Sequence, residues 1–213
     1  TSKGFEVALN LPMQPADYPV NDPGPYSMLH NLSTGENLSR LDWIFGRSPK
    51  IVGLYTIENE TFTNSRAGIT PILEGIQKRN KILVYGNLTN EQTIKSLSEN
   101  LNLHFAPSAL QIDSVLDEEK IKNNLLKLEG MAMTQGAAVG YMSAYPISLD
   151  IANKWINEID SSKLILVPIS KLFNITPQSE EITRQYEKER LLKGTKEVPA
   201  EQSSAAHDEH GGG

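Results

Sequence analysis

Apolar residues recur along the chain in short continuous runs, and between those runs they recur at helical spacing. The continuous runs predict strands at residues 6–11, 51–57, 81–85, 104–112, 137–142 and 164–169. Some of them, such as residues 81–85, are apolar almost throughout, which is typical of strands covered on both faces. Strands of this kind belong to parallel sheets, so the pattern favours an α/β fold.

Five segments between the runs predict helices, the first at about residues 36–46 and the third at about 91–101. The second, fourth and fifth each place apolar residues on one face: Ile69, Ile72, Leu73 and Ile76; then Ile121, Leu125, Leu128 and Ala132; then Ala152, Trp155, Ile156 and Ile159. The predicted N-caps of the last three helices are Asn90, Asp117 and Ser148. Because strands that alternate with helices pair in parallel through right-handed crossovers, we expect an α/β layer or barrel.

Composition changes near residue 173 and divides the chain in two. We expect one domain at residues 1–176 and a charged, disordered tail without an apolar face at 177–213. The net charge is −6, and no basic run contains interleaved aromatic residues, so nucleic acid is not an expected partner. No apolar run reaches the about 18–20 residues that cross a bilayer, so we expect no membrane span. Cysteine is absent, which excludes disulfides and thiolate chemistry.

Polar side chains follow several predicted strands, at the edge where α/β proteins place their clefts. Two carboxylates, Asp22 and Asp113, are candidates for catalytic acid and base, although either residue is also consistent with a purely structural role. Neutral side chains that suit sugar hydroxyls and sugar faces are the candidates for substrate binding: Asn10, Gln14, Tyr55, Tyr85, Asn87 and Ser143. Glu58 and Glu60 are expected to be loop charges in solvent.

The histidines give poor support for a metal site. They are His30, His104, His207 and His210, and none of them has a His-x-x-x-His spacing. A structural role is expected for His30 and His104, and the other two lie in the predicted tail.

Several blocks resemble the divergent polysaccharide deacetylase family over about residues 4–173. They include Leu11-Pro12-Met13 with Asn21-Asp22-Pro23-Gly24-Pro25, then Ile112-Asp113, and finally Leu166-Val167-Pro168-Ile169-Ser170. The resemblance implies a distorted (β/α) barrel of the polysaccharide deacetylase type that lacks its first strands in this chain, so that the domain is N-terminally incomplete. It also implies a carbohydrate-related protein of the bacterial periplasm or cell envelope, with a glycan or peptidoglycan fragment as its partner.

Related deacetylases hold a divalent metal that activates water, and the resemblance implies which positions of this chain correspond to the metal ligands. Asn10 and Ile57 stand at two histidine positions, Tyr85 stands at an aspartate position, and Tyr141 lies in a block that carries a histidine. Isoleucine cannot bind a metal, and an amide is a feeble zinc ligand. We therefore expect a degenerate metal site and no cofactor, in a protein that binds glycan or has a regulatory role.

Two alternatives stay open, so whether the chain is an enzyme is not decided by its sequence. One is an active deacetylase of N- or O-acetylated polysaccharide or peptidoglycan, in which a divalent metal such as zinc is recruited through the missing N-terminal strand together with Asp22 or Asp113. The other is an envelope scaffold that docks a protein partner through residues 179–213.

Overall fold

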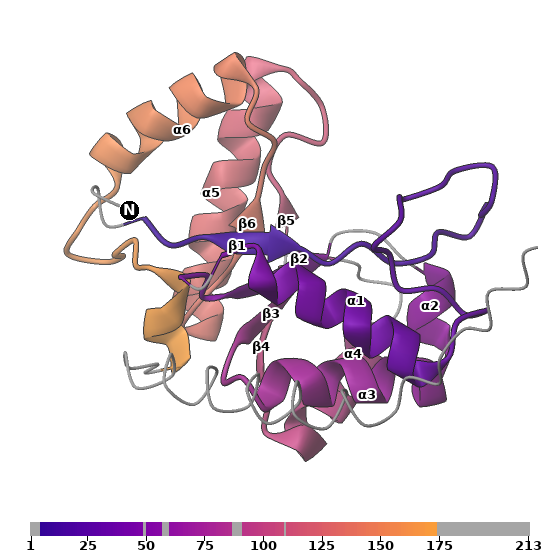
Figure 1. Cartoon of the computed structure of the whole chain (residues 1–213). Coiled ribbons are helices and arrows are strands. Elements are labelled where there is room, and N and C mark those ends of the chain that lie inside the picture. Colours follow the sequence, from indigo (N-terminus) through magenta and orange to yellow (C-terminus); the bar gives the residue numbers. More distant parts are fainter. Residues whose placement is uncertain (1–4, 49, 57–59, 87–90, 109, 174–213) are drawn as a thin grey trace, which may run out of the picture.

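The strands pair in parallel and are joined by helices, as the computed structural model of the chain shows (Figure 1). It describes residues 5–48, 50–56, 60–86, 91–108 and 110–173. The larger sheet has the order β1-β2-β3-β4 and consists of β1 (Ala8–Asn10), β2 (Gly53–Thr56), β3 (Ile82–Tyr85) and β4 (His104–Pro107). The smaller sheet pairs β5 (Leu110–Gln111) with β6 (Gly140–Tyr141). The predicted α/β class with parallel strands is confirmed.

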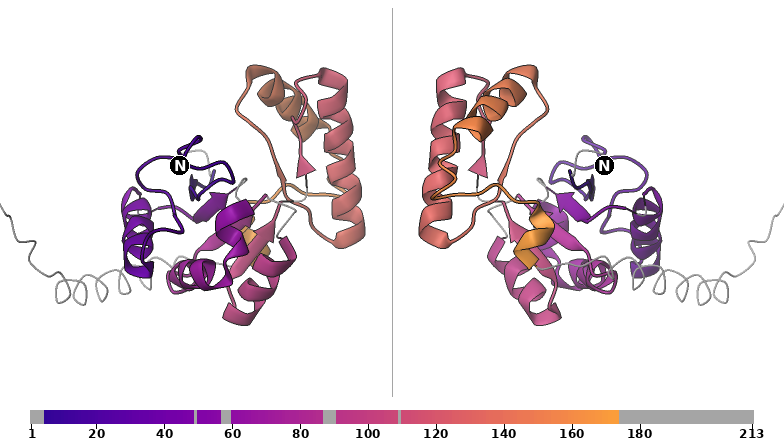
Figure 2. Two further views of the ribbon diagram at one scale, coloured as in Figure 1. Left: turned by 90° about the vertical axis from the view of Figure 1, so that its right-hand side faces the viewer. Right: turned by 90° about the vertical axis from the view of Figure 1, so that its left-hand side faces the viewer.

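Helices cover one face of each sheet. Within the described residues they are α1 (Thr34–Gly46), α2 (Glu60–Asn64), α3 (Arg66–Gln77), α4 (Glu91–Leu101), α5 (Glu118–Gln135), α6 (Pro146–Glu158) and the 3₁₀ helix η1 (Ile169–Phe173). Figures 1 and 2 show α5 and α6 side by side, on the opposite side of the molecule from α1. None of the described helices combines the length and the apolar composition that a bilayer crossing requires.

Two hydrophobic cores follow from this arrangement. In the larger core, Leu54 and Leu83 of the sheet pack against apolar residues of α1, α3 and α4, such as Leu41 and Ile72. The smaller core joins Ile112, after β5, to apolar residues of α5 and α6. In each sheet the helices therefore cover one face, and the opposite face is available for a site.

Helix ends differ in places from the predicted ones. The first helix begins at Thr34 because Ser33 and Glu36 form a capping box, in which each side chain binds the backbone N–H of the other residue. Asp117 caps α5 as predicted, since its carboxylate accepts the N–H of Lys120. The prediction of Ser148 as a cap was wrong, because α6 already begins at Pro146. Asn90 lies outside the described residues.

Three predicted segments also fold differently. Residues 104–112 form two strands, β4 and β5, that belong to different sheets. Glu60 begins the short helix α2 and does not lie in a loop. The prediction of a strand at residues 164–169 was wrong. No described strand pairs with this segment, its Ile165 is 75% exposed, and η1 begins at Ile169. An apolar run forms a strand only where neighbouring strands accept its hydrogen bonds.

One edge of the larger sheet is open within the described residues, where β1 pairs only with β2. The Leu11 N–H donates to the Tyr55 carbonyl, and the Val7 carbonyl accepts from Val52. Because the peptide groups of a strand alternate in direction, those of Ala8 and Asn10 point away from β2. At the amino end of β1, Glu6 accepts hydrogen bonds from the backbone and side chain of Ser170 in η1. This contact holds η1 against the start of the strand.

Candidate functional site

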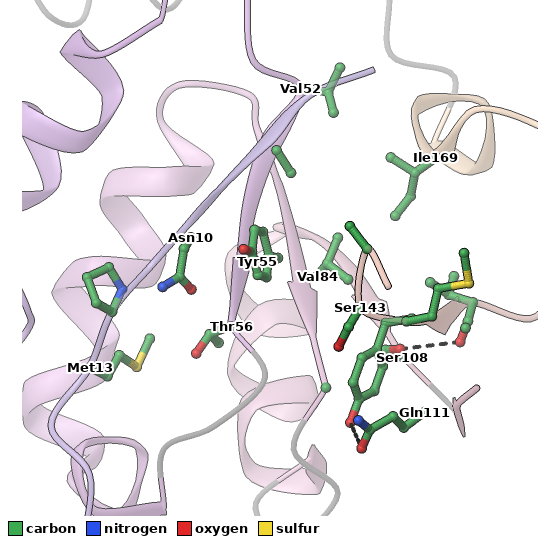
Figure 3. Close-up of a pocket in the computed structure, with 18 of the residues that line it drawn as sticks. Asn10, Met13, Val52, Tyr55, Thr56, Val84, Ser108, Gln111, Ser143 and Ile169 are labelled. Atoms are coloured by element: carbon green, nitrogen blue, oxygen red, sulfur yellow. Dashed lines mark hydrogen bonds between the residues drawn. The ribbon is translucent and has the colours of Figure 1, made fainter. Parts of the chain in front are cut away.

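A cleft of about 1430 Å³ separates the exposed face of the larger sheet from the smaller sheet. Figure 3 shows the side chains that project into it from the two walls. Its neutral polar lining residues are Asn10, Asn21, Tyr55, Thr56, Ser108, Gln111, Tyr141 and Ser143. Most of them lie at or just beyond the carboxyl ends of strands, where clefts of parallel α/β proteins are found.

Strand pairing sets the wall of the cleft formed by the larger sheet. Asn10 pairs with Tyr55, and Tyr55 pairs with Val84, so these three residues form one row across β1, β2 and β3. Their neighbours Leu54 and Leu83 lie in the core beneath the helices. Because successive side chains of a strand point to opposite faces, the row faces the cleft. Asn10 is exposed there, and its carboxamide is free to meet a ligand (Figure 3).

The opposite wall comes from the smaller sheet and the segments next to it. The Tyr141 hydroxyl donates to Oε1 of Gln111 over 3.3 Å, which joins β6 to β5 on the cleft side (Figure 3). Ser108 connects the two sheets, since its N–H donates to the Tyr85 carbonyl at 2.8 Å and its hydroxyl to the Val139 carbonyl at 3.4 Å. Hydroxyl and amide groups therefore face the polar row of the larger sheet across the cleft.

Asp113 supports this wall from behind. Its side chain is only 5% exposed, and Oδ2 accepts hydrogen bonds from the Ser143 N–H and the Ser148 hydroxyl, both at 2.8 Å. The carboxylate thereby fixes the turn between β6 and α6 that brings Ser143 to the cleft. Its other oxygen, Oδ1, is buried without a partner among the described residues. Asp113 is not one of the residues that line the cleft.

The other candidate carboxylate, Asp22, is exposed and accepts the N–H of Gly24 at 2.9 Å. This is a local turn contact, and Gly24 adopts φ +100°, a conformation that favours glycine. Gln14 lies nearby, where its side-chain oxygen accepts the His30 N–H at 2.9 Å. Neither Asp22 nor Gln14 lines the cleft. The structure thus does not bring Asp22 and Asp113 together at the ligand face.

The remaining predicted residues divide into two groups. Asn10, Tyr55 and Ser143 meet at the cleft, on its two walls. Tyr85 is 1% exposed and packs in the larger core, where its ring lies 6.2 Å from that of Phe105. Asn87 lies outside the described residues.

Sequence reasoning did not propose Thr56, Ser108 or Gln111 for the site, and it considered Tyr141 only through the block that carries a histidine in related deacetylases. A signal for them exists, because each is polar and lies at or next to the end of a strand. For Ser108 and Gln111 the prediction of a single strand at residues 104–112 conceals this signal, because it places both residues inside the strand. The break between β4 and β5 places these two side chains at the cleft.

Fold and site together define a class: an α/β protein with parallel strands and a neutral polar cleft at their carboxyl ends. The model of the divergent polysaccharide deacetylase family matches residues 1–173, and the chain belongs to this family. Membership supports a carbohydrate-related function.

A solved structure is similar over most of the chain. It is the crystal structure of an uncharacterized protein, ATU2773, from Agrobacterium tumefaciens C58, with a TM-score of 0.76 and 23% sequence identity. The match covers 80% of this chain and 70% of that one. At this identity the likeness concerns the fold alone. Among curated proteins, none matches the sequence.

The residues of the cleft do not fit a divalent metal ion of the kind implied for metal-dependent deacetylases. In the part of the chain that the structure describes, no three His, Cys, Asp or Glu side chains are placed to hold a metal. Asn10 offers an amide, and the phenol of Tyr141 binds Gln111. These are poor ligands for zinc. Ile57 lies outside the described residues.

Proposed function

We propose that the cleft binds a segment of polysaccharide, and that it does so without a metal held by residues of this chain. The observation that carries the proposal is the convergence of amide and hydroxyl side chains from two sheets on one cleft. Each amide offers both a donor and an acceptor, and each hydroxyl can serve as either, which matches the hydroxyl groups of a sugar. Family membership supports the same ligand class.

The apolar lining complements these polar groups. Val52 and Val84 of the larger sheet lie across from Val139 and Met142, and the Tyr55 ring lies beside Val84. Sugar rings have apolar faces and polar edges, so they suit a cleft in which apolar surface alternates with a few oriented polar groups. The proposal therefore places ring faces against the valines and Tyr55, and hydroxyls against Asn10 and Gln111.

We place this activity in the bacterial cell envelope, in a glycan-binding or regulatory role without deacetylation. Among the described residues, Glu6 is the one carboxylate that lines the cleft, and the backbone and side chain of Ser170 already donate to it. Asp113 is engaged behind the wall and Asp22 in a turn, so we assign water activation to none of these three residues. The donor set does not fit a metal that would take over this task. Both points favour binding over hydrolysis.

Calorimetric titration of the chain of residues 1–213 tests the proposal. The probes are β-1,4-linked hexamers of glucose and of N-acetylglucosamine. We expect saturable binding of at least one hexamer and a loss of affinity in Gln111→Ala of about 2- to 12-fold, which corresponds to one neutral hydrogen bond of about 0.5–1.5 kcal/mol. Gln92→Ala is the matched control, because Gln92 is exposed on α4, across the larger sheet from the cleft.

Two results contradict this function. Absence of binding to both hexamers refutes glycan recognition by the cleft. Release of acetate from the N-acetylglucosamine hexamer with added zinc, above the same reaction with a chelator, supports the metal-dependent deacetylase alternative and refutes a purely binding role.

A further inference from the structure

The charges around the cleft point to a narrower ligand class. We infer that the cleft selects oligosaccharide segments without negative charge and discriminates against polyanionic ones such as uronic acid polymers. This inference rests on the proposed function and deepens it, because it names the class of glycan. It follows from the lining, from the nearest helix end and from the charge of the whole chain.

The described residues of the lining include no cation that would receive an anionic sugar. Among the described residues that line the cleft there is no lysine, arginine or histidine, and Glu6 is the single charged side chain. Carboxylate groups of ligands are recognised mainly by Arg and Lys through charge-assisted hydrogen bonds. A uronic acid that entered this cleft would lose part of its hydration without gaining such a partner. A neutral ring loses less hydration and finds amides and hydroxyls.

Two buried cations outside the cleft, Arg79 and Lys81, already bind partners within the protein. Arg79 is fully buried and pairs with Asp42 while it donates to the Gly75 carbonyl. Lys81 donates through Nζ to the Ile51 carbonyl at 2.8 Å. Neither residue lines the cleft. They stabilise the protein on the amino side of the larger sheet and do not supply positive charge to the ligand.

The amino end of α6 is the next place that would attract an anion, because the first turn of a helix is positively polarised. It lies close to the cleft, since Ser143 and Ala144 line the cleft and α6 begins at Pro146. The carboxylate of Asp113 lies beside this turn, because it accepts the Ser143 N–H before the helix and the Ser148 hydroxyl within it. A second anion would meet a buried negative charge there.

The net charge of −6 on the whole chain acts in the same direction. A negative protein slows the approach of a polyanion, and salt weakens this repulsion. Size adds a second restriction, since a cleft of about 1430 Å³ exceeds the roughly 300–1,000 Å³ that encloses one drug-sized ligand. The ligand class is therefore an uncharged oligosaccharide of several rings.

Matched hexamers test this inference by calorimetry on the chain of residues 1–213 at pH 7. The β-1,4-linked glucose hexamer is compared with the β-1,4-linked glucuronic acid hexamer, which differs only in the oxidation of C6. We expect the neutral hexamer to bind at least tenfold more tightly at low salt, and the ratio to fall when salt is raised. Equal or tighter binding of the glucuronic acid hexamer overturns the inference and leaves glycan binding intact. If the glucose, glucuronic acid and N-acetylglucosamine hexamers all fail to bind, the proposed function itself fails.

A variant that adds a cation gives an independent readout. Gln111→Lys places a positive charge on the cleft wall, and we expect it to raise the affinity for the glucuronic acid hexamer at least fivefold. Gln92→Lys adds the same charge on α4 and is expected to change that affinity less than twofold. If Gln111→Lys keeps a native circular dichroism spectrum and gains no affinity for the anion, the charge of the lining does not set the selectivity and the inference is wrong.

Discussion

Removal of the Asp113 carboxylate is expected to destabilise the wall that carries Ser143. In Asp113→Ala, the Ser143 N–H and the Ser148 hydroxyl lose the acceptor that each now contacts at 2.8 Å. The Ser143 donor lies in the turn from β6 to α6, and Ser148 lies in the first turn of α6, where it is fully buried. Water does not readily replace the lost acceptor at the buried Ser148, so this hydroxyl remains unsatisfied in the folded protein, whereas the N–H of the exposed Ser143 can bind water.

The expected magnitude follows from these contacts. Hydrogen bonds to a charged group contribute about 1.5–3 kcal/mol each, which gives about 3–6 kcal/mol for two. The wild-type protein already bears the cost of the unpartnered Oδ1, about 1–3 kcal/mol, and the alanine variant is relieved of it. We therefore expect a net loss of about 3 kcal/mol. Asp113→Asn keeps an acceptor for the two donors and removes the buried charge, so its loss is expected to be about 1 kcal/mol.

Urea unfolding followed by circular dichroism measures both variants against the wild type. Asp150→Ala is the control, because Asp150 is an exposed acid on α6 that pairs with Lys154, and its loss is expected to stay below about 1 kcal/mol. A loss below about 1 kcal/mol in Asp113→Ala would show that the two bonds do not stabilise the fold in the way argued above. Equal losses in the alanine and asparagine variants would show that the acceptor geometry is irrelevant.

Three further predictions concern the frame around the cleft, and each is checked by the free energy of unfolding in urea. Gly53→Ala is expected to lose more than about 3 kcal/mol of unfolding free energy, because its Cβ would lie 2.1 Å from the Ile82 carbonyl oxygen. The control Gly130→Ala has open space around its Cβ in α5 and is expected to gain about 0.5–1 kcal/mol. Equal effects of the two substitutions would contradict the role of this close approach. Ser33→Ala removes the N-cap of α1 and is expected to lose about 1 kcal/mol, so an unchanged value would show that the capping box is not stabilising. Burial lowers the pKa of His104 below the ordinary histidine value of about 6.5, so the unfolded chain binds the proton first as the pH falls. The stability present above pH about 6.5 is therefore lost as the pH falls through the folded pKa. The wild type minus His104→Gln difference should therefore decline below pH 6.5, and a difference that is flat or rises toward acid would refute this assignment.

The sequence by itself determined the class of fold and three of the residues that line the cleft. Continuous apolar runs and helical spacing are local properties, so the parallel α/β class could be predicted from them. Asn10, Tyr55 and Ser143 were identified because polar residues beyond strands of such a protein meet at one edge of the sheet. The cap at Asp117 was predictable for the same local reason, since its side chain binds a backbone group three residues away.

Only the tertiary structure decided which side chains face the cleft. Tyr55 and Tyr85 both lie near the ends of apolar strands, yet Tyr55 lines the cleft and Tyr85 packs in the core. The sequences of β2 and β3 are apolar almost throughout and show no alternation that marks one face as the cleft, so the assignment depends on where the helices pack. The role of Asp113 likewise depends on Ser148, which is 35 residues away along the chain. Contacts over such separations arise from packing, and local sequence patterns do not contain them.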